Sequence, residues 1–379
     1  MRRQGGVRKR TGSGPKPCRS LTPPWPACSI ERVSQKRLLV EPDYCALGWR
    51  FGALTAQRFG GMLSPLTFVL PDGRTASPLF LAPWVAEFPD PAWPPVITHL
   101  RGEWPCVPFG VRPDPAGFSP AWAAAIESAA DQRPLHGYGS NRDWQFTQVS
   151  SSMLELTCIY PDEDDVHSLT RRIRPLPDAP AVELSLTVRA RRTTRVPMGL
   201  HFTFGCNRSP AIIRPGRFAA GWTYPGPLGA TQSFAHDRRF DNLACVPGRA
   251  VSRLDATRFP FDEPNEDLLQ LTGVEGSCSL EYPAEAYRVE LAWNRAHFPS
   301  LLLWLSNRAL EIPPWSGRTV ALGVEPVCSA FGLGSGVSSH ANPIAESGTN
   351  TAIDIEAGQS FETTYWISAH PVGSDPIAV

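Results

Sequence analysis

Forty prolines are spread along the 379 residues of this chain, and they restrict its fold more than any other feature. A proline lacks a backbone N–H, so it breaks the interior of a helix and is poorly tolerated in a central strand. This density of prolines therefore favours many surface loops that join short elements. No internal repeat of fixed period is visible.

Between the loops, the sequence has the pattern of strands. Residues 181–190 (AVELSLTVRA) alternate apolar and polar side chains with the period of two that is typical of a half-buried strand. The one segment that predicts a helix is 119–131, with Ser119 as N-cap and Pro120 at the first helical position. We therefore expect an all-β chain that forms one large antiparallel β-sandwich with one short helix. The other predicted strands are 153–160, 287–293, 300–306, 319–325 and 361–368.

The charge is distributed unevenly along the chain. Residues 1–36 hold nine Lys and Arg but a single acidic residue, Glu31, whereas the remainder holds 27 basic and 35 acidic residues. The basic segment is rich in Gly, Pro and Ser and has no apolar periodicity. We therefore expect a disordered leader over residues 1–37 and a folded domain over 38–379. An organelle transit peptide or a misassigned start codon also fits the basic segment.

The composition of the body argues against several classes of protein. Its mild acidity argues against a nucleic-acid-binding surface. No apolar run approaches the roughly 18–20 residues that span a membrane. Its seven cysteines are scattered singly, without a CxxC pair, which favours reduced thiols over disulfides or a zinc site and predicts a cytoplasmic protein.

The stretch TVALGVEPV, residues 319–327, carries a carboxylate where its own pattern would continue with an apolar residue. It predicts a buried strand that ends at Glu325, directly before Pro326. A buried carboxylate needs a partner or takes a raised pKa, and such residues gather at functional sites. A glutamate that faces solvent at the end of a strand explains the same pattern, so both interpretations stand.

Four other polar residues interrupt apolar or tight-loop sequence: His201 in PMGLHFTFG, His136 in PLHGYGSNRDWQF, Arg101 in LRGEWPCVPFG and Asp267 in FDEPNEDLLQL. Each has an ordinary structural explanation as well. His201 fits a buried core histidine and His136 a turn, whereas Arg101 fits a surface arginine and Asp267 an aspartate at the start of a strand. Gly137, next to His136, would let the backbone approach a neighbouring group closely. The combination of the four carries more weight than any of them alone.

Taken in order, these stretches resemble the aldose 1-epimerase (galactose mutarotase) family. The resemblance lies in RGEWPCVPFG, HGYGSNRDW, LHFTFG, NEDLLQL and GVEPV, and it covers the chain from about residue 45 to about residue 375. It is nearest to the branch that includes the glucose-6-phosphate 1-epimerases. It implies a galactose mutarotase-like β-sandwich and an isomerase that interconverts the α and β anomers of a hexose.

Anomerisation opens a cyclic hemiacetal and recloses it on the other face, so it needs a group that removes the proton of the anomeric hydroxyl and a group that protonates the ring oxygen. The resemblance implies Glu325 as the base and His201 as the acid. It implies His136 and Arg101 as ligands of sugar oxygens and Asp267 as a partner of ring hydroxyls. It implies no metal and no cofactor, in agreement with a sequence that has no Gly-rich phosphate loop and no metal-ligand motif.

The sequence departs from the family pattern in three places. Sugar-phosphate members carry an arginine shortly after HG, where this chain has Ser140, so a hexose 6-phosphate remains an alternative substrate to a free hexose. Arg112 in FGVRP competes with Arg101 for the role of the arginine. Asp241 in RRFDNLACV competes with Asp267 for the role of the acidic residue.

Three functions therefore remain for the body: an aldose 1-epimerase, a non-catalytic carbohydrate-binding module and a glycoside hydrolase. A hydrolase would use Glu325 with Asp267 as two carboxyl groups roughly 5–10 Å apart. The presence of both His201 and Glu325 favours the epimerase, as a monomer or a homodimer. The candidate aromatic partners of a sugar ring are Trp84, Trp104, Trp144 and Trp315.

Overall fold

The computed structural model describes residues 42–87, 89–129 and 133–373. The predicted leader, residues 1–37, lies outside these described residues, as does the end of the predicted helix at 130–131. The predicted folded domain, 38–379, is thus described over most of its length.

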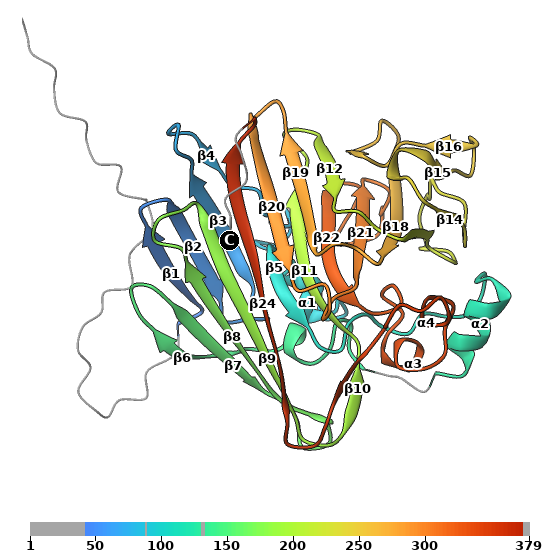
Figure 1. Cartoon of the computed structure of the whole chain (residues 1–379), viewed down its shortest axis with the longest axis horizontal. Coiled ribbons are helices and arrows are strands. Elements are labelled where there is room, and N and C mark those ends of the chain that lie inside the picture. Colours follow the sequence, from blue (N-terminus) through green and yellow to red (C-terminus); the bar gives the residue numbers. More distant parts are fainter. Residues whose placement is uncertain (1–41, 88, 130–132, 374–379) are drawn as a thin grey trace, which may run out of the picture. The chain divides into compact units, whose positions relative to one another are not determined.

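Two large antiparallel sheets make up most of the described residues (Figure 1). The larger, eleven-stranded sheet contains, in spatial order, β1 (Tyr44–Trp49), β2 (Gly52–Gln57), β3 (Leu63–Val69), β5 (Glu103–Cys106), β11 (Met198–Gly205), β22 (Val320–Cys328), β21 (Ser300–Asn307), β18 (Asn265–Thr272), β13 (Ala220–Thr223) and β14 (Arg239–Phe240), with β4 (Thr75–Ala76) paired to β3. The nine-stranded sheet contains β17 (Arg258–Phe259), β12 (Ala211–Pro215), β19 (Ser277–Tyr282), β20 (Tyr287–Trp293), β24 (Ser360–Pro371), β9 (Ala181–Ala190), β8 (Val166–Pro175), β7 (Leu154–Ile159) and β6 (Gln145–Val149). Two small ribbons pair β10 (Thr194–Val196) with β23 (Ile353–Ile355) and β15 (Val246–Pro247) with β16 (Arg253–Leu254). The predicted antiparallel β-sandwich is confirmed.

The alternating segments of the sequence form strands as predicted, and β9 has the predicted bounds. The predicted helix begins as expected with Ser119 before Pro120, and α2 runs over Pro120–Glu127. Within the described residues, three single-turn helices occur in addition: α1 (Pro95–Thr98), α3 (Ser335–Ser338) and α4 (Pro343–Glu346). Two 3-10 turns, η1 (Gly139–Asn141) and η2 (Leu243–Cys245), complete the described elements. One turn is too short to show the helical period of 3.6 residues in a sequence.

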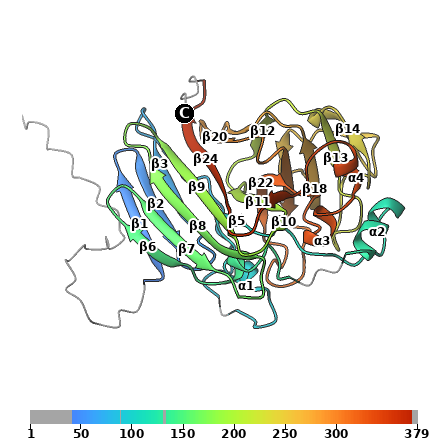
Figure 2. The ribbon, with the colours of Figure 1, turned by 60° about the horizontal axis from the view of Figure 1, so that its bottom comes forward.

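The hydrophobic core lies between the two sheets, and a second apolar cluster covers the outer face of the eleven-stranded sheet. Leu301 and Leu303 of β21 belong to the core, whereas Leu302, between them, belongs to the second cluster. Successive side chains of a strand point to opposite faces, so β21 separates the two clusters. Figure 2 shows α1, α3 and α4 beside the central strands of this sheet, where they contribute apolar residues to the second cluster.

Two further sequence predictions concern the cysteines and the absence of membrane-spanning segments. Five buried cysteines are free thiols, as expected: Cys106, Cys158, Cys206, Cys278 and Cys328. Among the described residues, no helix combines the length and the apolar character that crossing a membrane requires.

Candidate active site

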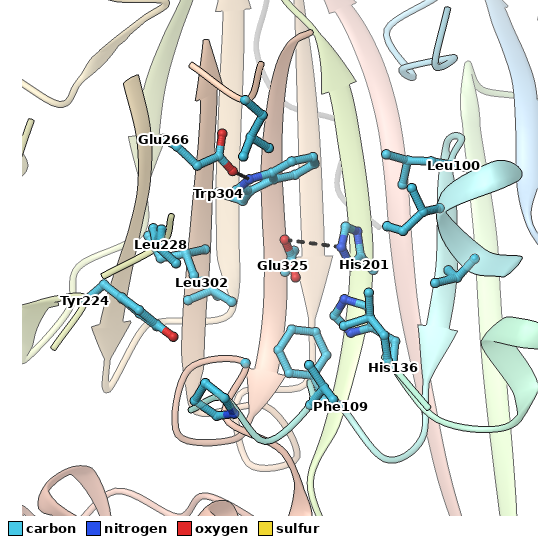
Figure 3. Close-up of a pocket in the computed structure, with 18 of the residues that line it drawn as sticks. Leu100, Phe109, His136, His201, Tyr224, Leu228, Glu266, Leu302, Trp304 and Glu325 are labelled. Atoms are coloured by element: carbon cyan, nitrogen blue, oxygen red, sulfur yellow. Dashed lines mark hydrogen bonds and ion pairs between the residues drawn. The ribbon is translucent and has the colours of Figure 1, made fainter. Parts of the chain in front are cut away.

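His201 and Glu325 face each other in the centre of the eleven-stranded sheet, on its outer face (Figure 3). His201 of β11 pairs with Trp104 of β5 on one side, and the register of β11 against β22 places Glu325 opposite it on the other. The backbone ladder is interrupted here because Pro326 has no N–H to donate. The His201 Nε2–Glu325 Oε1 distance is 3.6 Å, which is too long for a direct hydrogen bond.

Glu325 is buried, with 2% of its surface exposed, so the interpretation of a solvent-facing glutamate is wrong. The expectation that the strand ends at Glu325 is also wrong, because β22 continues through Pro326 to Cys328. Burial raises the pKa of Glu325 well above its ordinary value, and Oε2 has no hydrogen-bond partner among the described residues.

The imidazole of His201 is held on two sides. Its ring stacks on the indole of Trp104, with centroids 4.1 Å apart and an interplanar angle of 15°. Its Nδ1 lies 3.2 Å from the hydroxyl of Thr203, which is two residues further along β11 and therefore on the same face of the sheet. Burial, and secondarily the neighbouring His136, lower the pKa of His201 well below its ordinary value. Both shifts favour the uncharged form of the pair, with the proton on the carboxyl group of Glu325.

His136 lies beside this pair, with its ring centroid 5.0 Å from that of His201. Its backbone has a φ of 58°, which is uncommon for a residue other than glycine. The strained turn is fixed by Gly110, whose N–H donates to Nδ1 of His136 and whose carbonyl accepts from the His136 N–H. Burial lowers the pKa of His136 to about 4, so the neutral ring carries its proton on Nε2. The expected close approach at Gly137 is present, because a Cβ there would lie 2.1 Å from the carbonyl oxygen of Val107.

Glu266 of β18 is a second buried carboxyl group in the site, and the sequence analysis missed it. Its Oε1 accepts a 2.5 Å hydrogen bond from the indole N–H of Trp304, whereas its Oε2 has no partner among the described residues. Burial raises the pKa of Glu266 to about 8. The signal in the sequence was the period of two in NEDLLQL, which puts Glu266 on the same face as Leu268 and Gln270.

These side chains border one cavity of about 390 Å³, a size typical of sites for small molecules. Strands β5, β11, β22, β21 and β18 form its floor, and the segments 96–100, 109–113, 135–136, 224–228, 310–315 and 332 contribute to its walls. Figure 3 shows Glu325 and His201 in the middle of the site and the Glu266–Trp304 pair to one side. Within the part of the chain that the structure describes, no three His, Cys, Asp or Glu side chains group together as metal ligands would.

Four residues predicted for the site do not line this cavity. Arg101 precedes β5 and donates from Nε to the carbonyl of His99. Arg112 donates from Nε to the carbonyl of Ile126 and so ties its loop to α2. Asp241 is exposed after β14.

Asp267 is buried, but its carboxylate serves the fold. It accepts from the backbone N–H groups of Ser233 and Phe234 and from the side chain of Asn265. It therefore holds a loop against the start of β18, on the face opposite to Glu266.

Two of the four candidate tryptophans, Trp104 and Trp315, line the cavity. Trp84 packs behind Trp315 with ring centroids 5.6 Å apart. Trp144 lies in the core between the sheets. The sequence analysis did not single out Trp304, which lines the cavity from β21.

A buried glutamic acid with a raised pKa makes the stability of the fold depend on pH. Unfolded glutamate ionises near pH 4.3, whereas folded Glu266 keeps its proton to about pH 8. Between these values the folded state binds more protons than the unfolded state, so the contribution of Glu266 is fully present below pH 4 and is lost as the pH rises towards 8. The slope approaches about 1.4 kcal/mol per pH unit at most.

We expect the Glu266→Gln variant to gain stability relative to the native protein as the pH rises from 5.5 to 8.5. Urea unfolding at both pH values measures the difference. The exposed Glu263→Gln serves as the control, and its difference from the native protein should not change with pH. A pH-independent difference for Glu266→Gln would contradict the raised pKa.

The described residues thus form an antiparallel β-sandwich with a buried carboxyl–imidazole pair on the outer face of its larger sheet. The chain is similar in structure to a candidate aldose 1-epimerase from Escherichia coli K12 (TM-score 0.57, 16% identity, 87% of this chain and 99% of that chain covered). It is also similar to an aldose epimerase homologue from C. elegans (TM-score 0.57, 10% identity, 87% and 99% covered) and to a galactose mutarotase-like protein from Lactobacillus casei (TM-score 0.54, 13% identity, 86% and 100% covered). No family model matches the chain, and no curated protein matches its sequence.

The chain therefore has the galactose mutarotase-like fold of the aldose 1-epimerases. The likeness expected from the sequence is confirmed at the level of the fold. The matches do not distinguish the glucose-6-phosphate branch from the others.

Proposed function

We propose that the protein is a cofactor-independent aldose 1-epimerase that interconverts the α and β anomers of a sugar hemiacetal. The observation that supports this proposal is the buried pair of His201 and Glu325, whose Nε2 and Oε1 atoms lie 3.6 Å apart at the floor of a cavity of suitable size. A pair of titratable groups whose environments push their pKa values apart is the usual arrangement for acid–base chemistry.

The reaction proceeds in two balanced steps. In the first, neutral His201 takes the proton of the anomeric hydroxyl through Nε2, the bond between C1 and the ring oxygen breaks, and the carboxyl group of Glu325 protonates the ring oxygen. The carbonyl group then rotates about the C1–C2 bond. In the second step, Glu325 takes the proton back from the hydroxyl that attacks C1, and His201 returns its proton to the anomeric oxygen. No proton or electron is gained or lost overall.

This assignment reverses the roles that the family resemblance implies for the first proton transfer. Burial raises the pKa of Glu325 and lowers that of His201, and both shifts favour Glu325 as the acid and His201 as the base of the first step. The mechanism requires the tautomer of His201 that is protonated on Nδ1, which can donate to the hydroxyl of Thr203 3.2 Å away and keeps Nε2 free for the substrate. The roles exchange on ring closure, so each residue serves once as acid and once as base.

Two further groups are placed to bind substrate oxygens. Nε2 of His136 is a donor, because Nδ1 accepts from the N–H of Gly110. Oε2 of Glu266 is without a partner among the described residues. The carboxylate of Asp267 accepts hydrogen bonds from a loop. The hypothesis of a glycoside hydrolase that pairs Asp267 with Glu325 therefore gains no support.

Exchange spectroscopy by NMR tests the proposal directly. Selective saturation of one anomeric proton of a sugar reports the rate at which it converts to the other anomer. We expect the protein to accelerate this exchange over buffer for at least one member of a panel of hemiacetals, and we expect the exposed Asp241→Asn variant to match the native rate. No acceleration across the panel would refute the epimerase.

Gly323 leaves the space that the carboxyl group of Glu325 occupies. A Cβ at this position would lie 2.4 Å from Oε1 of Glu325 and 2.8 Å from Cβ of Trp304. We expect Gly323→Ala to displace the carboxyl group from His201 and to lower the rate of anomerisation roughly ten- to a hundredfold, because small misplacements of a reacting group have such costs.

Gly205→Ala is the matched control, since Gly205 lies in β11 and a Cβ there would meet only a side-chain oxygen of Asn207 at 3.8 Å. It should retain the native rate of anomerisation. Equal rates for the two variants would show that the packing around Glu325 does not position it.

A further inference from the structure

The cavity that holds His201 and Glu325 is largely apolar. Nine of the twenty residues that line it are aliphatic, among them Leu100, Leu228, Leu268 and Leu302, and five more are aromatic. Leu302 pairs directly with Glu325 across β21 and β22, so aliphatic side chains reach the floor beside the reacting groups and are not confined to the rim. Figure 3 shows Leu302, Leu228 and Leu100 around the central pair.

The polar groups left for a ligand are few. His201 and Glu325 are needed for proton transfer. Nδ1 of His136 and Oε1 of Glu266 already have protein partners, which leaves one nitrogen and one oxygen of these two residues. Otherwise the side chains lining the cavity offer the hydroxyl of Tyr224, whereas the indole nitrogens of Trp104 and Trp315 are themselves buried.

This supply does not match an unmodified hexose. Besides the anomeric hydroxyl, a hexopyranose carries four hydroxyl groups, each with one donor and two acceptor positions. Each hydroxyl that is desolvated against an aliphatic wall without a partner lowers affinity roughly tenfold. A methoxy or a methylene group at the same place has no donor to satisfy, and each buried methyl group strengthens binding about fourfold.

An anionic sugar fits still less well. No arginine or lysine is present among the described residues that line the cavity, since Arg101 and Arg112 donate to backbone carbonyls elsewhere. The cavity instead contains two carboxyl groups, Glu266 and Glu325. A phosphate group would meet no positive charge there and would repel both carboxylates once they ionise.

We infer that the substrate is a sugar hemiacetal whose hydroxyl groups, apart from the anomeric one, are largely removed or alkylated. The reaction in this inference rests on the proposed epimerase function. The class of ligand rests on the apolar lining of the cavity. The anomeric hydroxyl and the ring oxygen face His201 and Glu325. The apolar substituents lie against Leu228, Leu268 and Leu302.

Two measurements on the native protein test the inference separately from the proposed function. Binding is followed through the fluorescence of the cavity tryptophans, and turnover is followed by NMR exchange of the anomeric protons. The probes are D-glucose, D-galactose, glucose 6-phosphate, 2,6-dideoxy-D-arabino-hexose and 2,3,4,6-tetra-O-methyl-D-glucopyranose. The last two keep the hemiacetal of glucose but distinguish loss of hydroxyls from alkylation.

We expect at least one of the two modified sugars to bind at least tenfold more tightly than glucose and galactose, and glucose 6-phosphate to bind most weakly. Tighter binding without faster exchange would support the apolar ligand and refute the epimerase. Faster exchange of glucose or galactose, with equal or tighter binding than the modified sugars, would support the epimerase and overturn the inference. Absence of binding by both modified sugars overturns it as well.

A variant of the cavity wall tests whether the apolar lining causes the preference for modified sugars. Leu268 is half-buried at the cavity, so Leu268→Asn adds an amide there with little loss of core packing. We expect it to weaken binding of the preferred modified sugar at least fivefold and to bring its affinity closer to that of glucose. The exposed Leu81→Asn is the matched control and should bind as the native protein does. An unchanged preference in Leu268→Asn would overturn the role of the apolar wall.

Discussion

The Glu325→Gln variant is expected to lose the acceleration of anomerisation by about two to four orders of magnitude, the range that a general acid–base group contributes. The amide has nearly the shape of the carboxyl group but cannot transfer a proton to the ring oxygen. Burial raises the pKa of Glu325 and so favours its protonated form, which is the acid of the proposed first step. NMR exchange with the preferred hemiacetal measures the rate.

Controls distinguish lost chemistry from a lost site. Glu325→Gln should keep its affinity for the hemiacetal within about threefold by tryptophan fluorescence, because the cavity keeps its shape. His201→Gln should lose a similar factor in rate, and the double variant should be hardly slower than the slower single variant, since residues that act as a unit have non-additive effects. A Glu325→Gln variant that keeps a third of the native rate would contradict the mechanism.

The pH profile of the native rate follows from the same pair. Burial raises the pKa of Glu325 and lowers that of His201, and both shifts widen the range of pH over which the pair is uncharged. The rate should be flat there and should fall in acid, as His201 gains a proton, and in alkali, as Glu325 loses one. A rate that rises steadily from pH 5 to pH 8 would indicate that ionised Glu325 is the working form.

The strands and the pair of His201 and Glu325 could be predicted from the sequence for different reasons. Alternation with a period of two is local, so it predicts β9 and β20 directly. The meeting of His201 with Glu325 depends on the register of two strands that lie far apart in the chain, and no local pattern contains that register. The order of the motifs, taken with the family resemblance, supplied it.

Asp267, the acidic residue of β18 that the sequence predicts for the site, does not line the cavity, because neighbouring residues of a strand point to opposite faces. Asp267 and Glu266 are neighbours, yet Glu266 points into the cavity and Asp267 anchors a loop on the other face. Arg101 and Arg112 lie in connecting segments, where a sequence carries no period to fix the direction of a side chain. Their hydrogen bonds to backbone carbonyls are tertiary contacts that no spacing predicts.

The largest expected effect on stability comes from a buried ion pair between the two sheets. Glu103 of β5 and Arg171 of β8 are fully buried, and Nη2 of Arg171 lies 2.5 Å from Oε2 of Glu103. The hydroxyl of Tyr365 in β24 donates to the other carboxylate oxygen at 2.8 Å. The group thus joins the eleven-stranded sheet to the nine-stranded sheet through charges that no water reaches.

Arg171→Met is expected to lower the free energy of unfolding by about 3–5 kcal/mol, because it leaves the carboxylate of Glu103 buried and unpaired. The additional change Glu103→Gln removes that charge and keeps an acceptor for Tyr365, so the double variant should recover most of the loss. Denaturant unfolding of the native protein, both single variants and the double variant gives the coupling energy. A loss below about 1 kcal/mol in Arg171→Met would show that the pair does not hold the sheets together.

The same pair bears on the active site through the strand that carries it. Glu103 and Trp104 are consecutive in β5. The ion pair fixes Glu103 between the sheets, and the next residue, Trp104, stacks on His201 on the opposite face. If the pair matters only by anchoring β5, the double variant that regains stability should also regain the rate of anomerisation, whereas Arg171→Met alone should be slower. A double variant that is stable but slow would mean that the charges themselves act on the acid–base pair, across the thickness of the sheet.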